Sequence, residues 1–300
     1  MMKKLIRPAM LILPLGAGIF FPQAAILAQA PYNFIRWALG AMIFCNVLQI
    51  NFSDLKPRKE HFTVLLLNIL MGIIPFYLLR FLCPADPVYS HAAFFTGIAP
   101  TATATAVIVS LLNGNVAFAI TGFLITNIGI SFVLLFLIPL ISGNFTAAFL
   151  LNVLYSIVIA ILIPMLCARI TRHFFHAILD HTAKLKNFTL LLWSASLFLI
   201  AAVARQYFDQ NAGASLGGLC ILALISGVLC ALNFTIGYFL TKSEFRRDTS
   251  QILGQKNTTF ALYLALEYST GIAALSTIFY VLFHNLWNSL QLLSFHEKRK

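Results

Sequence analysis

The sequence is poor in charge, and acidic residues are the scarcest of all. Only 9 of its 300 residues are Asp or Glu, and charged residues together make up 10% of the chain, against 60% apolar residues. Soluble domains contain about a quarter charged residues, so this composition excludes a soluble domain and indicates an integral membrane protein. Crossing roughly 30 Å of hydrocarbon takes about 20 residues of helix, and the apolar blocks recur at a matching spacing.

The sequence also lacks the patterns of catalytic and metal sites. Its 5 cysteines are scattered, and none forms a Cys-x-x-Cys pair, so we expect them to serve packing. There is no His-Glu-x-x-His, no Gly-x-Gly-x-x-Gly and no Gly-x-Ser-x-Gly. We therefore expect neither an enzyme nor a bound cofactor or metal.

Basic residues are the charged residues that the chain does have, and they give a net charge of +11. They lie in short loops between apolar segments, where they set orientation and do not indicate nucleic acid. With ten spans, nearly all of these loops fall on one side, which predicts both termini in the cytoplasm of an inner or plasma membrane. Nothing in the sequence defines an oligomeric state. The predicted spans are 5–29, 31–51, 62–83, 91–112, 116–140, 146–168, 187–206, 214–241, 250–266 and 270–294.

The N-terminal segment "MMKKLIRPAMLILPLGAGIFFPQAAILAQA" has two interpretations. A basic start, an apolar run and Ala28-Gln29-Ala30 resemble a cleaved signal peptide. Against this, the apolar run is long, Pro14 and Pro22 interrupt it, and Pro31 would follow the cut directly. We predict a retained first span.

The longest basic loop, "RITRHFFHAILDHTAKLK", divides the ten spans into two sets of five. An odd number of spans in each set inverts the second relative to the first, so we predict inverted repeats over about 1–168 and 187–300. Corresponding helices of such repeats are often interrupted. The fourth span contains "GIAPTATATAVIVSLLNGN" and the ninth opens with "SQILGQKNTTFALYLAL". We predict an all-α membrane protein in which these two spans are broken and cross near the midplane.

Broken helices leave backbone N–H and C=O groups that need a partner in protein, water or ligand, and a helix N-terminus there favours an anion. The Thr and Ala run has a second interpretation, since small residues also let membrane helices pack closely. On the last span, His284 and Asn285 either cross-link helices or line a cavity. Other intramembrane amides, which the pattern does not rank, are Asn46, Gln49, Asn68, Asn127 and Asn233. The predicted substrate-binding residues are Pro100, Thr101, Thr103, Thr105, Lys256, Asn257, Thr258 and Asn285.

Several motifs together resemble the bile acid:sodium symporter family. They are "PLGAGIFFPQ", "GIAPTATATAVIVSLLNGNVAFAITGFLITNIGISFVLLFLIPLI", "LGQKNTTFALYLAL" and "FYVLFHNLWNSL". The resemblance implies a panel domain (5–51 and 146–206) and a core domain (62–140 and 214–294) within a single transporter domain over 1–300. It also implies secondary active transport of a bulky, amphipathic substrate by alternating access. The positive charge of the predicted site indicates that this substrate is an organic anion.

The chain departs from the family pattern at its sodium sites. Thr105 and Ala106 stand where the family has Ser-Asn, Lys256 replaces a Gln, and Ile252 replaces an acidic residue. Our hypothesis is that the Lys256 ammonium replaces a sodium ion, so that an anion is moved without the usual sodium sites. Lys256 has two other interpretations: it snorkels to water along its stem, or it titrates and couples transport to protons. A sodium- or proton-coupled symporter, a weak-acid exporter, and a channel or sensor of the same fold stay open as alternatives.

Overall fold

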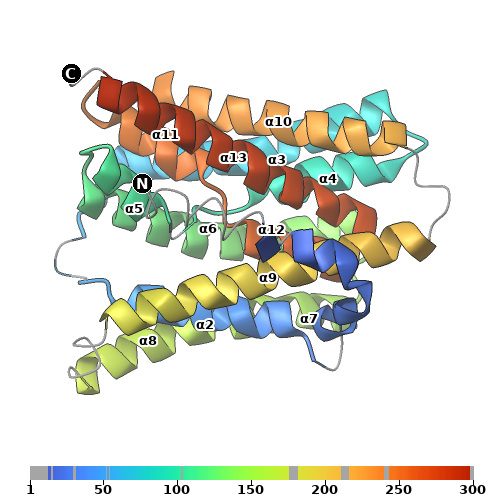
Figure 1. Ribbon diagram of the computed structural model, residues 1–300, viewed down its shortest axis with the longest axis horizontal. Helices are drawn as coiled ribbons and strands as arrows, with labels where there is room; N and C mark the ends of the chain where they lie inside the picture. Colours follow the sequence, from blue (N-terminus) through green and yellow to red (C-terminus); the bar gives the residue numbers. More distant parts are fainter. Residues whose placement is uncertain are drawn as a thin grey trace. The chain divides into compact units, whose positions relative to one another are not determined.

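The computed structural model describes residues 13–14, 16–29, 32–51, 53, 55–102, 104–175, 182–210, 216–239 and 243–297 (Figure 1). This part of the chain is helical and contains no β-strand. Its helices are the 3-10 helices η1 (Pro22–Ala28) and η5 (Ser243–Phe245), the π-helical turn η3 (Val158–Leu162), and the α-helices α2 (Phe34–Leu48), α3 (Lys59–Leu82), α4 (Pro87–Ile98), α5 (Thr105–Leu111), α6 (Val116–Ser142), α7 (Ala147–Ile157), α8 (Ile163–Phe174), α9 (Thr182–Gln210), α10 (Leu216–Phe239), α11 (Arg246–Gly254), α12 (Thr258–Tyr268) and α13 (Gly271–Glu297).

Four of the described helical runs are long and apolar enough to cross a membrane. They are α3, α6, the continuous run Ala147–Phe174 and α10. Shorter apolar helical stretches are Phe34–Leu48 and Asn187–Val203. Large apolar side chains are exposed on these helices, among them Phe81 and Phe136, as expected of surfaces that contact lipid. The chain is therefore an all-α protein with several helices able to span a bilayer.

The chain forms two compact units, each built from two separated stretches. Unit 1 comprises Met1–Ile50 and Ala147–Ser215, and unit 2 comprises Asn51–Thr146 and Leu216–Lys300. In unit 1, α2 packs against both α8 and α9. The guanidinium of Arg172 on α8 donates to the carbonyl of Leu48 at the end of α2, at 2.8 Å. The run from α7 to α8 passes through the π-helical turn just before Pro164, whose missing N–H such a turn accommodates.

In unit 2 the helices approach each other closely where glycines face neighbouring backbone. A Cβ at Gly97 of α4 would collide with the Met71 carbonyl of α3, and one at Gly237 of α10 would collide with the backbone of α11. Small residues at helix contacts are the usual means of close packing in membranes. Here they hold α4 against α3 and α11 against α10.

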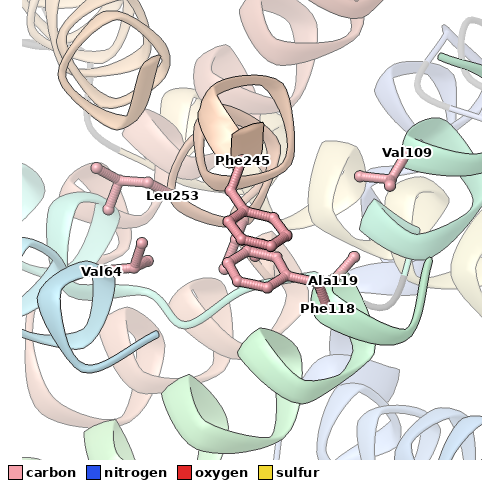
Figure 2. Packing of buried hydrophobic residues seen from close by; sticks show 7 residues of the cluster. Val64, Val109, Phe118, Ala119, Phe245 and Leu253 are labelled. Carbon is pink, nitrogen blue, oxygen red and sulfur yellow. The ribbon is translucent and has the colours of Figure 1, made fainter. Parts of the chain in front are cut away.

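One apolar cluster of unit 2 joins three separate stretches of the chain: α3, the pair α5 and α6, and the pair η5 and α11 (Figure 2). Phe118 of α6 and Phe245 of η5 stack face to face at its centre, with ring centroids 4.2 Å apart and an interplanar angle of 8°. The cluster fixes the start of α11 against the start of α6. Its members are Val64, Val109, Phe118, Ala119, Phe245, Ile252 and Leu253.

Candidate functional site

Two interruptions divide helical stretches of unit 2. The first break is residues 99–104, between α4 and α5, and the second break is residues 255–257, between α11 and α12. Ala99 has an extended backbone, with φ −48° and ψ 132°, because the ring of Pro100 disfavours helical geometry in the residue before it. The first break thus begins at the residue preceding the proline.

The two breaks pair with each other. Thr101 and Lys256 form an antiparallel β-bridge. The Ala102 N–H donates to the Gln255 carbonyl at 2.8 Å, and the Asn257 N–H donates to the Pro100 carbonyl at 2.7 Å. Each break therefore supplies partners for backbone groups that the other would leave unpaired, which an apolar surrounding requires.

Side chains from α3 and α6 hold the first break. The amide of Asn68 on α3 donates to the Ala99 carbonyl at 3.1 Å. The amide of Asn127 on α6 donates to the Thr101 carbonyl at 3.0 Å, and the Thr126 hydroxyl lies 2.9 Å from that of Thr101. The Thr101 hydroxyl in turn donates to the Ile252 carbonyl of α11 at 2.7 Å. This bond connects the first break to α11.

Lys256 is buried where the two breaks pair, a place named here the crossing. Only 1% of it is exposed, and its ammonium donates to the side-chain oxygen of Asn68. No carboxylate in the described part of the chain forms a salt bridge with it. The ammonium does not snorkel to the surface, so that interpretation is wrong. The crossing instead contains a lysine whose hydrogen-bond partner is a neutral amide.

The structure brings some of the predicted site residues together and not others. Pro100, Thr101, Lys256 and Asn257 meet at the crossing, and Asn257 also caps α12 by accepting the Phe260 N–H at 3.2 Å. Thr258 is buried at the start of α12.

The remaining predicted residues lie around the crossing or apart from it. Thr105 is buried at the start of α5, and its hydroxyl has no hydrogen-bond partner among the described residues. Ala106 follows it and is half-buried. Ile252 takes part through its backbone carbonyl, which accepts the Thr101 hydroxyl. Asn285 donates back to Val281 of its own helix at 2.7 Å. Thr103 lies outside the described residues.

Asn68, Asn127 and Thr126 are the contacts that sequence analysis did not place at the site. The two asparagines carried a signal, since an amide inside an apolar helix needs a polar partner. Nothing in the sequence related either of them to a particular break. Thr126 gave no signal, because a threonine in a helix commonly bonds its own preceding turn, as this one also does at Gly122.

Asp248, in the first turn of α11, is hydrogen-bonded to the start of α6. Its carboxylate accepts the Asn115 N–H at 3.1 Å, and the Asn115 side chain caps α6 by accepting the Phe118 N–H at 2.9 Å. Asp248 precedes the predicted ninth span and is 4% exposed. Burial raises the pKa of its carboxyl, while the Asn115 N–H and the charge of Arg247 act in the opposite direction.

Among the described residues, no group of three or more His, Cys, Asp and Glu side chains could hold a metal ion. No family model matches the chain, and no curated protein matches it. Inferences about function therefore depend on the crossing itself.

Proposed function

We propose that the protein is a secondary active transporter of an organic anion, and that Lys256 serves as a fixed cation in place of a coupled sodium ion. The observation that carries this proposal is a buried lysine at the meeting point of two helix breaks, with a neutral partner and no carboxylate in salt-bridge contact. The proposal draws its transport mechanism and the apolar bulk of the substrate from the family resemblance.

The charge of Lys256 supports an anionic substrate. A lysine within a membrane costs about 2.5–3.5 kcal/mol on insertion scales, so such residues usually serve a function. Its ammonium has three N–H donors, and Asn68 accepts one. The N-terminus of α12, which begins two residues later, adds partial positive charge. Both effects favour a bound anion.

The same charge argues against sodium. A cation site needs several oxygen ligands, and an ammonium beside those oxygens would repel the ion. The Ala99, Pro100 and Thr101 carbonyls of the first break already accept from α3, the second break and α6, and the Thr101 hydroxyl already donates to α11. We therefore expect transport to be independent of sodium, with the fixed ammonium keeping the crossing positive.

The architecture in this proposal has ten spans in two inverted repeats, in an inner or plasma membrane with both termini in the cytoplasm. Alternating access would move a panel domain against a core domain. The division of the chain into two compact units, each made from two distant stretches, supports such a motion. The concentration of the interrupted helices within unit 2 supports its role as the core.

The experiment is ligand-dependent stabilisation of the purified protein in detergent. Melting temperature is measured in sodium chloride and in potassium chloride at equal ionic strength, with acetate, pyruvate, benzoate and taurocholate as probes. A ligand at a hundred times its Kd stabilises the folded state by about 2.7 kcal/mol, which a melting curve detects. We expect at least one anion to stabilise the protein equally in both salts.

Lys256→Gln is the decisive variant, and Lys184→Gln is its control because Lys184 is exposed on α9 of unit 1. The proposal requires that Lys256→Gln abolish the response to the anion and that Lys184→Gln preserve it. Stabilisation by sodium alone, or a need for sodium before any anion acts, would contradict it. Uptake of the stabilising anion into proteoliposomes, with and without a pH gradient, then separates proton coupling from uniport.

A further inference from the structure

Five exposed cations lie at the starts of two helices of unit 2. Lys56, Arg58 and Lys59 lie at the start of α3, and Arg246 and Arg247 open α11. We infer that these five residues, named here the basic surface, bind the headgroup of an anionic phospholipid. The inference requires only that α3 and α10 cross a bilayer, and it does not depend on transport.

A stack of side chains brings the two groups of cations to one place. The Arg58 guanidinium carbon lies 4.9 Å from the centroid of the Phe245 ring. Phe245 stacks on Phe118 (Figure 2). The ring of His61 on α3 also packs against Phe118, with the two ring centroids 4.0 Å apart. Because Phe245 directly precedes Arg246, the contact places both helix starts on the same surface.

The charges on this surface are unfavourable for the protein alone. The N-terminus of a helix carries partial positive charge, so cations there oppose the helix dipole. Among the described residues near this surface, three carboxylates stand against the five cations: Glu60 is half-buried, Glu244 is exposed, and Asp248 is buried and accepts the Asn115 N–H. An anion of outside origin would relieve this repulsion.

Apolar side chains beside the cations indicate that the anion is a lipid. Phe62 is exposed on the first turn of α3, with Leu66 one turn further along that helix. On α10, the ring of Tyr238 lies 6.0 Å from the Arg246 guanidinium carbon, and Phe239 is exposed next to it. A free phosphate needs only the cations. A phospholipid also uses the aromatic and aliphatic surface, which suits its glycerol backbone and acyl chains.

The test measures melting temperature in detergent with added dioleoylphosphatidylglycerol or dioleoylphosphatidylcholine at equal mole fraction. We expect the anionic lipid to raise the melting temperature by about 3 °C more than the zwitterionic one, and the difference to shrink in high salt. The combined variant Lys56→Gln, Lys59→Gln, Arg246→Gln is expected to lose this difference.

A matched pair on one helix controls for total charge. Lys59→Gln removes a cation from the basic surface, whereas Arg80→Gln removes an exposed one from the opposite end of α3. Lys59→Gln should reduce the difference in melting temperature between the two lipids, and Arg80→Gln should leave that difference unchanged. If the combined variant folds poorly, these two single variants test the inference in its place. An equal loss of stabilisation by the anionic lipid in Lys59→Gln and Arg80→Gln would overturn the inference. So would a wild-type protein that both lipids stabilise equally. Glycerol 3-phosphate is the soluble probe, and an equal rise with it would show a general anion site and overturn the lipid assignment.

Discussion

The two helix breaks differ in how they are held. The second break is short, and its last residue, Asn257, caps the helix that follows: the Asn257 side chain accepts the Phe260 N–H in the first turn of α12. The first break is longer, and the helix after it begins without a side-chain cap. Its backbone is held from outside instead, by Asn68 of α3 and Asn127 of α6.

This difference shows that polar residues in intact helices can stabilise an interruption elsewhere. The first break depends on α3 and α6. The second has its own cap and its pairing with the first, and α13 adds one contact at its edge, where the Tyr280 hydroxyl donates to the Gly254 carbonyl at 2.8 Å. Lys256 connects the two, since it lies in the second break and uses the same Asn68 that holds the first. Loss of outside contacts should therefore be more harmful than loss of the local cap.

The largest effect is expected for Asn68→Leu. This change leaves the Ala99 carbonyl and the Lys256 ammonium without the partner they share. A buried unpaired polar group costs about 1–3 kcal/mol and more when it is charged, so we expect a loss of about 3 kcal/mol in the free energy of unfolding. Chemical denaturation in detergent measures it.

Lys256→Met provides the matching test of that explanation. In the double variant with Asn68→Leu no charge is left unpaired, so the two losses should sum to more than the loss measured in the double variant. Simple additivity would show that Asn68 does not act through Lys256.

Asn127→Leu is expected to be the next most harmful change. It removes the donor to the Thr101 carbonyl and to the Phe123 carbonyl, for a loss of about 1–3 kcal/mol. Ser131→Ala, one turn along α6, is the control, since among the described residues the Ser131 hydroxyl bonds the Asn127 carbonyl of its own helix and nothing else. Equal losses in the two variants would mean that α6 does not hold the first break.

Asn257→Ala should cost about 1 kcal/mol, the usual loss of an N-cap. Asn257→Asp keeps an oxygen that accepts the Phe260 N–H and should retain most of the stability. The melting temperatures of the wild-type protein, Asn257→Ala and Asn257→Asp, measured under the same conditions, test this expectation. A loss with Asn257→Ala as large as that with Asn68→Leu would reverse the contrast between the two breaks.

Thr105→Val is expected to change stability least. The buried Thr105 hydroxyl has no partner in the part of the chain that the structure describes, so replacing it with a methyl group should be neutral or slightly stabilising. Thr101→Val is the contrast, because the Thr101 hydroxyl donates to the Ile252 carbonyl. If Thr105→Val instead weakens stabilisation by an anion without affecting the free protein, Thr105 contacts the ligand.

The interruptions were predictable from the sequence, because Pro100 and the polar run around Lys256 violate the pattern of an apolar helix. The contact between Asn68 and Lys256 was not predictable, since residues so distant in sequence share no periodicity. Asn285 was predicted at the site from a motif alone, whereas its side chain bonds its own helix. Patterns along the chain thus predicted where helices stop. Only the packing showed which groups replace the backbone hydrogen bonds that are lost at each break.

The antiparallel pairing of the breaks has a consequence for biogenesis. The ribosome makes the first break early, then the second stretch of unit 1, and only afterwards the residues that pair with Pro100 and Ala102. Unit 1 is therefore complete while these two backbone groups still lack their partners. If α4 and α5 lie in the bilayer, as we propose, these groups are not tolerated against lipid, and the two helices need water or an insertion factor beside them until Asn257 has been translated.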